Sequence, residues 1–266
     1  MNDAAKGQVN KSAAEVYEDF FVPALFQQWT ARVADAAEIG AGQRVLDVAC
    51  GTGTLTREIA ARVGAEGSVV GVDINDGMLE VARRKTPQVE WRRGAAEALP
   101  FEDHSFDAVV CQFALMFFTD RRAAIREMLR VLRPGGRLAV AVWDRVENSP
   151  GYAAVTGLLQ RLFGDEAANA LRAPFNLGDE QALRSEFANA GISGLEIMTR
   201  AGTARFSSIK DWMYTDVKGW TLADMIDDAQ FDRLLKEAEV ALKEFVDADG
   251  NATFAAPAHI VSVTKS

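Results

Sequence analysis

Short apolar runs alternate with amphipathic segments between residues 44 and 143, and this alternation constrains the fold more than any other feature. Five of the runs have strand length, and apolar residues recur at helical spacing between several of them. The predicted strands are residues 44–49, 68–72, 89–92, 106–111 and 137–143, and the predicted helices are residues 55–63, 77–85 and 121–132. Strands that are apolar throughout and separated by helices are typical of a parallel sheet covered on both faces.

The flanking segments are mostly helical in pattern. Residues 13–37 indicate a helix that Pro23 breaks or kinks. Further helices are predicted over residues 151–190, with breaks near Gly164 and Pro174, and over residues 207–246, while residues 195–199 and 259–264 favour two late strands. We therefore expect a doubly wound, Rossmann-like α/β fold with a seven-stranded sheet, in which five parallel strands are completed by a late antiparallel hairpin strand.

The length of 266 residues corresponds to about 1.8 domains at ~150 residues each, so one large domain with insertions and two small domains are both open. Because the C-terminal part has no strand-helix rhythm of its own, we expect a single domain over residues 1–266. Its expected parts are an N-terminal helical lid (1–40), a cofactor-binding core (41–143) and late strands with helical cap insertions (144–266, the insertions at 144–190 and 203–250).

Charge and composition limit the classes of partner that can be expected. The net charge of −9 argues against nucleic acid or an anionic membrane surface as the main partner. The longest uncharged apolar stretch, residues 108–118, is shorter than the ~20 residues of a membrane helix, and residues 1–20 have no signal-peptide pattern. Two cysteines and two histidines are too few for a disulfide framework or a usual zinc site. We expect a cytoplasmic protein without a metal, with Cys50 and Cys111 as buried free thiols.

A glycine-rich turn follows the first predicted strand. Gly51 and Gly53 let the backbone approach a ligand closely at the start of a helix. Asp73 ends the next strand, where a carboxylate can bind both hydroxyls of a ribose. A dinucleotide fingerprint would place a third glycine at position 56, which is Thr56 here, and the nearby carboxylate of Asp47 would repel a pyrophosphate and attract a cation. The pattern indicates a nucleoside-bearing, positively charged cofactor.

At these residues the chain resembles a known family. Val45-Leu-Asp-Val-Ala-Cys-Gly-Thr-Gly53 resembles motif I of the class I S-adenosylmethionine-dependent methyltransferases, and Val70-Gly-Val-Asp73-Ile resembles their ribose-binding acidic loop. Gly94-Ala-Ala-Glu-Ala-Leu-Pro-Phe101, Ser105-Phe-Asp-Ala-Val-Val110 and Leu132-Arg-Pro-Gly-Gly-Arg-Leu138 resemble later motifs of the family. The likeness covers residues 44–143, and together with Ala258-His-Ile-Val261 it is greatest to the ubiquinone/menaquinone-biosynthesis-type branch.

The resemblance implies a set of residues around S-adenosylmethionine. Asp47, Ala49, Gly51, Thr52 and Gly53 would shape or contact the loop around its methionine part. Asp73 would hold the ribose, Ile74 and Met78 would pack on the adenine, Ala95, Ala96 and Glu97 would line its edge, and Gln112 and Phe113 would lie beneath the cofactor. Ala49 departs from the family, which often has glycine there. Structural alternatives remain for Asp47, as a carboxylate bonded to loop N–H groups, and for Glu97, as a surface charge.

The implied activity is methyl transfer to a small, apolar or aromatic acceptor. A hydroxyl or carbon-acid acceptor needs a base, for which His259, Tyr17 and Tyr214 are candidates only. A structural role is favoured for His259. His104 is expected in a solvated loop. The stripe of Tyr17, Phe21, Phe26 and Trp29 is either core or a lid. The aromatics of the second insertion are either packing or a pocket wall (Trp212, Met213, Tyr214, Trp220, Met225 and Phe231). The alternative function is a fold that binds S-adenosylmethionine without transferring methyl, as a cyclase or a regulatory module.

Overall fold

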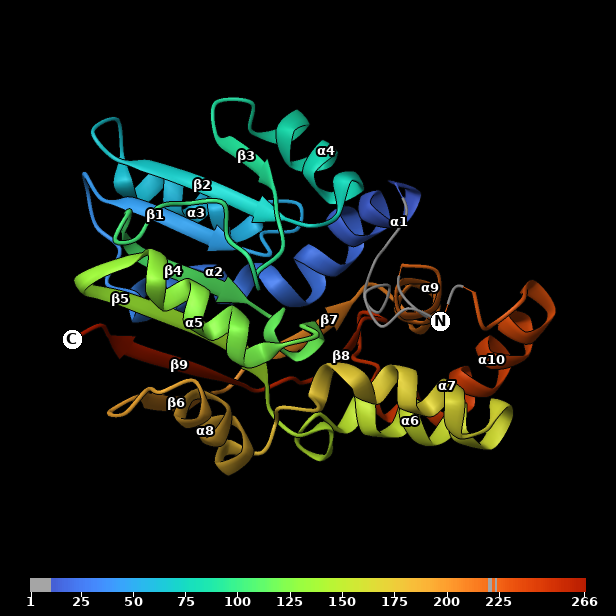
Figure 1. The fold of residues 1–266 in the computed structure, drawn as a ribbon. Coiled ribbons are helices and arrows are strands. Elements are labelled where there is room, and N and C mark those ends of the chain that lie inside the picture. Colours follow the sequence, from blue (N-terminus) through green and yellow to red (C-terminus); the bar gives the residue numbers. More distant parts are fainter. Residues whose placement is uncertain (1–10, 220–221, 223) are drawn as a thin grey trace.

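The computed structural model describes residues 11–219, 222 and 224–266, and its centre is a seven-stranded sheet (Figure 1). The strand order is β3-β2-β1-β4-β5-β9-β6. The strands are β1 (Arg44–Val48), β2 (Ser68–Asp73), β3 (Glu90–Arg93), β4 (Phe106–Gln112), β5 (Leu132–Trp143), β6 (Glu196–Arg200) and β9 (Ala258–Thr264). The first five run parallel, and β9 lies antiparallel to both β5 and β6. The expected doubly wound α/β sheet is confirmed.

Helices cover both faces of this sheet. On one face α2 (Gln27–Ala36) packs beside α3 (Thr54–Val63), and on the other α5 (Arg121–Val131) packs beside α8 (Glu180–Asn189). The helix α4 (Asp76–Lys85) contacts β2 and β3. Strands β1 and β4 are almost entirely buried between the layers, which explains their unbroken apolar sequences.

The N-terminal helix spans the predicted residues but changes type around Pro23. An α-helical start, α1 (Lys11–Val16), leads into a π-helical segment over Tyr17–Phe26, and α2 follows directly. In an α-helix the proline ring clashes with the carbonyl four residues earlier, and the wider π turn relieves that contact. The helix therefore passes through Pro23 instead of ending there.

The cap gathers at the carboxyl ends of the parallel strands (Figure 1). Its helices are α6 (Pro150–Phe163), α7 (Asp165–Arg172), α9 (Ile209–Lys218) and α10 (Asp228–Ala241). The helical insertion expected over residues 203–250 begins with a strand, because β7 (Thr203–Phe206) pairs with β8 (Ala252–Ala255) in a second, two-stranded sheet. Strands of four residues contain too few alternations to be recognised by pattern.

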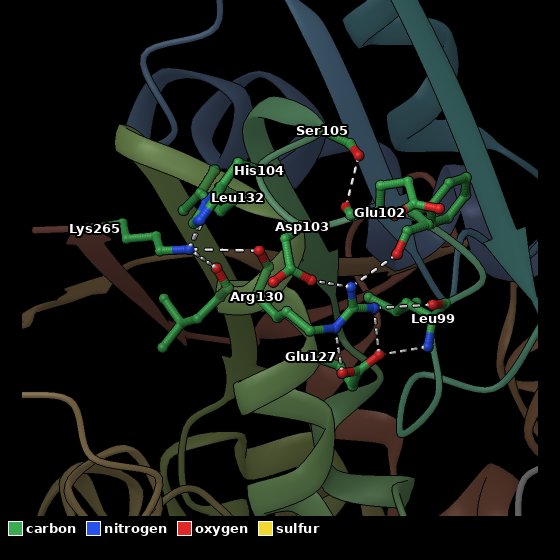
Figure 2. A network of polar contacts seen from close by, with 11 residues as sticks. Leu99, Glu102, Asp103, His104, Ser105, Glu127, Arg130, Leu132 and Lys265 are labelled. Carbon is green, nitrogen blue, oxygen red and sulfur yellow. Dashed lines mark hydrogen bonds and ion pairs between the residues drawn. The ribbon is translucent and has the colours of Figure 1, made fainter.

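A network of polar contacts closes the opposite end of the sheet (Figure 2). Arg130 on α5 pairs with Glu127 and Asp103, and it also donates to the carbonyls of Leu99 and Phe101. Lys265 donates to the last carbonyls of α5, those of Leu129 and Arg130, and to that of Leu132. These contacts fasten the loop before β4 and the end of β9 to α5, so we regard this end as structural.

His104 lies in that network, in an exposed turn before β4 as expected, with its Nδ1 atom 3.1 Å from the amine of Lys265. Within the described ranges, no helix is both long and apolar enough to cross a membrane.

Candidate active site

The candidate site lies where β1 and β4 are neighbours. The chain continues from β1 to β2 on one side and from β4 to β5 on the other, so the loops after β1 and β4 diverge. In open parallel sheets such a switch point is where ligands bind, at the carboxyl ends of the strands. The glycine turn, Asp73 and Gln112 all lie at these ends.

Asp73 connects the two loops of the site. Its Oδ2 atom accepts a hydrogen bond of 2.8 Å from the N–H of Gly51, and its Oδ1 atom accepts one of 2.8 Å from the N–H of Asn75. Burial raises the pKa of this carboxyl, while those backbone hydrogen bonds act in the opposite direction. Each carboxylate oxygen can accept a further hydrogen bond, so the side chain can still bind a pair of hydroxyls.

Asp47 is buried beneath the glycine turn. Its Oδ2 atom accepts a hydrogen bond of 2.5 Å from the hydroxyl of Thr56, in the first turn of α3. Burial raises the pKa of Asp47 to about 7, and the negative charge of Asp73 adds to the increase. Asp47 therefore fixes the start of α3 and also adds negative potential beneath the loop. Thr56 stands where a dinucleotide-binding fingerprint would have its third glycine, and here its hydroxyl donates a hydrogen bond to the carboxylate of Asp47.

Two non-glycine residues at the switch point have left-handed backbones. Ala49 follows β1 with a φ of 56°, and Phe113 follows β4 with a φ of 55°. Such conformations cost free energy for residues with a side chain and concentrate at functional sites. The positive φ of Ala49 explains why glycine suits this position.

Replacing Ala49 by glycine is expected to stabilise the protein by about 0.5–1 kcal/mol, because relief of the left-handed strain exceeds the added freedom of the unfolded chain. Urea unfolding monitored by circular dichroism measures this change. The matched control is Ala60→Gly within α3, which should destabilise the protein by about 1 kcal/mol. Equal destabilisation by both changes would contradict the strain at Ala49.

The expected adenine-side residues lie along the next two loops. Ile74 is 44% exposed, an unusual state for a large apolar side chain beside Asp73, whereas Met78 and Ala96 are buried and Ala95 is half-buried. The carboxylate of Glu97 accepts from the backbone N–H groups of Thr119 and Asp120, at 3.2 and 3.5 Å. Glu97 thus braces the loop after β4.

Two buried polar atoms at the switch point are placed to bind a polar ligand. The hydroxyl of Thr52 and the Oε1 atom of Gln112 are two of the nine buried side-chain atoms that have no hydrogen bond in the described part of the chain. Buried polar groups normally have partners. Both atoms belong to loops at the switch point, so a polar ligand bound there fits the side chains present.

The N-terminal helix covers the glycine turn. The ring of Tyr17 is the nearest group to Gly51 on its open side, 4.0 Å from where a Cβ atom would stand. Burial and the carboxylates of Asp73, Glu18 and Asp47 raise the pKa of Tyr17. Phe21, Phe26 and Trp29 of the same stripe are buried in the core. The helix is therefore part of the core, and its Tyr17 end lies over the site.

Besides Tyr17, two residues are candidates for a base, and the structure places them differently. Both ring nitrogens of His259 are engaged, Nε2 with the carbonyl of Gly178 at 2.9 Å and Nδ1 with the hydroxyl of Thr199 at 2.8 Å. The carboxylate of Asp144 lies 3.2 Å from Nε2. His259 therefore has a structural role, as favoured from the sequence. Tyr214 is 39% exposed and packs edge-on against Phe20, away from the buried side chains of the cap.

The cap contains a buried polar cluster that sequence reasoning missed. Asp216 on α9 is 3% exposed, and it accepts a hydrogen bond of 2.8 Å from the indole N–H of Trp212. Trp212 and Met213 are fully buried, and Trp220 lies outside the described residues. The sequence contained one signal for this cluster: Asp216 lies four residues after Trp212, on the apolar face of the predicted helix. Cys50 and Cys111 are buried free thiols, as expected.

Known proteins share both the sequence and the fold. A methyltransferase domain family matches residues 45–136. The ubiquinone/menaquinone biosynthesis C-methyltransferase UbiE of Pseudomonas putida is 33% identical over 216 residues, which cover 71% of this chain and 84% of that protein. This chain belongs to the ubiquinone/menaquinone-type branch of the class I S-adenosylmethionine-dependent methyltransferases.

Some other relatives match over less of their length. The enzyme of the same name from Idiomarina loihiensis is 42% identical over 137 residues, which are 49% of this chain and 55% of that protein. Over the first three relatives the matched part spans only 55–61% of their length. A putative methyltransferase from Bacillus halodurans has the same fold, with a TM-score of 0.60, 22% identity and coverage of 89% of this chain and 98% of that one.

Proposed function

We propose that this chain transfers the methyl group of S-adenosylmethionine to a small, aromatic or quinone-type acceptor. The observation that carries the proposal is the carboxylate of Asp73, which accepts the N–H of Gly51 at the switch point, where two buried polar atoms lack partners. The relatives that support it are named as ubiquinone/menaquinone biosynthesis C-methyltransferases. Those names favour transfer over a cyclase or a regulatory binding module. The charge of −9 favours a small acceptor over nucleic acid.

Within this proposal, residues 41–143 hold the cofactor and the segments 1–40 and 144–266 enclose the acceptor. Asp73 binds the ribose hydroxyls, and Ile74 and Met78 pack on the adenine. Ala95 and Ala96 border the adenine, while Glu97 acts by bracing the loop beside it. Thr52 and Gln112 supply polar contacts through atoms that lack partners, and Ala49, Gly51, Gly53 and Phe113 set the shape of the loops.

The bound cofactor supplies a methyl group on a sulfonium, which is a good leaving group. The protein then contributes by holding the acceptor in line with that group and by excluding water. Tyr17, Phe26 and Phe113 form a run of packed rings beside the loops, with centroids 5.1 Å apart for Tyr17 and Phe26 and 5.6 Å apart for Phe26 and Phe113. Such a wall keeps solvent from the reacting atoms.

Calorimetric titration with S-adenosylhomocysteine, beside NAD as the competing ligand class, tests the cofactor. Transfer of a labelled methyl group to naphthalene-1,4-diol, a reduced quinone, tests the acceptor class. We expect micromolar or tighter binding of S-adenosylhomocysteine and labelled product. Binding of NAD alone would contradict the proposed cofactor, and binding without transfer to the diol would contradict the proposed acceptor.

Affinity for S-adenosylhomocysteine should fall with decreasing pH. The ionised form of Asp47 attracts the ammonium of the ligand, and the pKa of Asp47 is raised to about 7, so protons compete with binding below that pH. The dissociation constant should rise below pH 7 and level off about tenfold higher, once Asp47 is fully protonated. Calorimetry between pH 5.5 and 8.5 measures this slope.

Asp47→Asn should bind about tenfold more weakly at pH 8, because a charge-assisted contact becomes neutral, and its affinity should change less with pH. The matched control is Asp35→Asn, which removes an exposed carboxylate outside the site. If the Asp47→Asn variant kept the pH slope of the wild type, Asp47 would not be the titrating group.

A further inference from the structure

The carboxylate of Asp216 is placed where a purely structural role would not require one. It is buried in the cap among aromatic rings, since Trp212 packs against Phe206, Phe254 and Phe245. Burying a carboxylate costs several kcal/mol unless it is well paired. Within the described part of the chain, Oδ2 accepts a short hydrogen bond from Trp212 at 2.8 Å, while Oδ1 has only a long contact of 3.5 Å with the hydroxyl of Tyr152. Oδ1 therefore has capacity for another partner.

A narrow cavity begins at Asp216. Its remaining walls are apolar or aromatic, apart from the hydroxyl of Tyr152, and they come from the N-terminal helix, the end of β5 and the cap. The lining residues are Leu25, Phe26, Trp143, Tyr152, Leu171, Pro174, Phe175 and Asp216. Apolar walls with one convergent polar group are typical of sites for small ligands. The accessible volume of the cavity is about 20 Å³, so an acceptor ring fits only if Phe26 and Phe175 turn aside.

The cavity adjoins the candidate cofactor loops through shared aromatic rings. Trp143 lines the cavity and stacks on Phe113, with centroids 3.9 Å apart and planes 10° apart. Phe113 directly follows Gln112 at the end of β4. Phe26 also lines the cavity and stacks on Tyr17, the residue over Gly51. The same rings therefore border the cofactor loops and the space in front of Asp216.

We propose that Asp216 binds a ring hydroxyl of the acceptor in this cavity and accepts its proton, while Trp212 and Tyr152 hold the carboxylate in place. This assignment rests on the proposed function and adds the residue that activates the acceptor. Trp212 fixes Oδ2, and Oδ1 is the atom that faces Tyr152 and takes the proton.

The step balances without a further reactant. The acceptor O–H bond breaks, its electron pair stays on oxygen, and the proton forms a carboxylic acid on Asp216. The charge on the ring oxygen makes the ortho carbon nucleophilic, so that this carbon bonds to the methyl group as the methyl–sulfur bond breaks and its electron pair stays on sulfur. The ring carbon then loses its hydrogen as a proton and the oxygen regains one, so each turnover releases one proton to solvent.

The surroundings of Asp216 set the pH at which it can act. Burial raises its pKa to about 8, and the hydrogen bonds from Trp212 and Tyr152 lower it from a still higher value. Among the described residues, Tyr152 is the titratable group in contact with the carboxylate, and no charged partner is recorded. Because the base must be ionised, the rate should rise with pH through about 8.

Asp216→Asn is the main test, because it keeps the size of the side chain and an acceptor for Trp212. We expect kcat for methylation of naphthalene-1,4-diol, measured without oxygen, to fall by about 10²–10⁴-fold, and the rise in rate between pH 6.5 and 8.5 to disappear. Tyr152→Phe should lower kcat less and keep that rise. The matched control is Asp232→Asn on α10, an exposed carboxylate, which should leave both unchanged.

Binding gives a readout independent of turnover. Quenching of tryptophan fluorescence should report probe binding beside Trp143, with wild type preferring the diol over 1,4-dimethoxynaphthalene at pH 8.5 and the Asp216→Asn variant losing that preference. Unchanged affinity for S-adenosylhomocysteine would show that the variant is folded.

The inference would be overturned if the Asp216→Asn variant kept the rate and the pH profile of the wild type. It would also be overturned if the rate of the wild type fell as the pH rose through 8. Both results would leave the proposed function intact. Failure of the wild type to bind S-adenosylhomocysteine, or to methylate the diol, would instead overturn the proposed function.

Discussion

Asp73→Ala should weaken binding of S-adenosylhomocysteine by about 10²–10⁴-fold. The carboxylate is positioned to make two charge-assisted hydrogen bonds to the ribose, each contributing about 1.5–3 kcal/mol. It also holds the N–H of Gly51, so its loss loosens the glycine turn. Both effects act in the same direction, and calorimetric titration at pH 8 measures their sum.

Two variants separate the contributions of Asp73. Asp73→Asn keeps one oxygen that can accept a hydrogen bond, so its affinity should fall less than that of the Asp73→Ala variant. Asp76→Ala, at the start of α4, removes an exposed carboxylate of the same loop and should change affinity by less than about threefold. A folded Asp73→Ala protein with nearly wild-type affinity would place the ribose elsewhere.

Gly53→Ala should destabilise the protein by about 2–5 kcal/mol. Gly53 has a φ of 84°, which costs an alanine about 1–2 kcal/mol. A Cβ atom at this position would also overlap the Cη2 atom of Trp91, whose indole packs against the turn, and overpacking costs a further 1–3 kcal/mol or so. Thermal or urea unfolding without ligand measures the change.

A double mutant resolves the two causes. Trp91→Phe shortens the ring, so Gly53→Ala in that background should cost only the conformational part, about 1–2 kcal/mol. Ala61→Gly, in the exposed part of α3, checks the scale of backbone effects with a cost of about 1 kcal/mol. If the cost of Gly53→Ala were the same in the Trp91→Phe background, steric overlap with Trp91 would not contribute.

The sheet could be predicted because its strands are buried on both faces. In such strands nearly every residue is apolar, as in β4 with Ala108, Val109 and Val110, so the sequence signal does not depend on knowing the neighbours. The two-stranded sheet of β7 and β8 could not be predicted, because each strand is four residues long and its partner lies far away in the chain. Pro23 indicated a disruption of the helix, but its accommodation by a π-helical segment depends on packing.

Residues of the site were predictable where the backbone dictates the residue type. Gly51, Gly53 and Asp73 follow from a turn between a strand and a helix and from its neighbouring strand end. Asp216 was not predictable, because its burial depends on how α9 packs within the cap. The engagement of Glu97 with residues 119 and 120 likewise depends on a contact between distant loops.

The position of β9 has a consequence for folding during synthesis. The latest strand along the chain lies inside the sheet, between β5 and β6, and residues 201–257 separate it from β6. Until it emerges from the ribosome, β5 and β6 have no strand to join them and expose open edges. Such edges favour association between chains. A nascent chain can therefore complete β1 to β5 early, but it remains prone to aggregation until residues 258–264 are available.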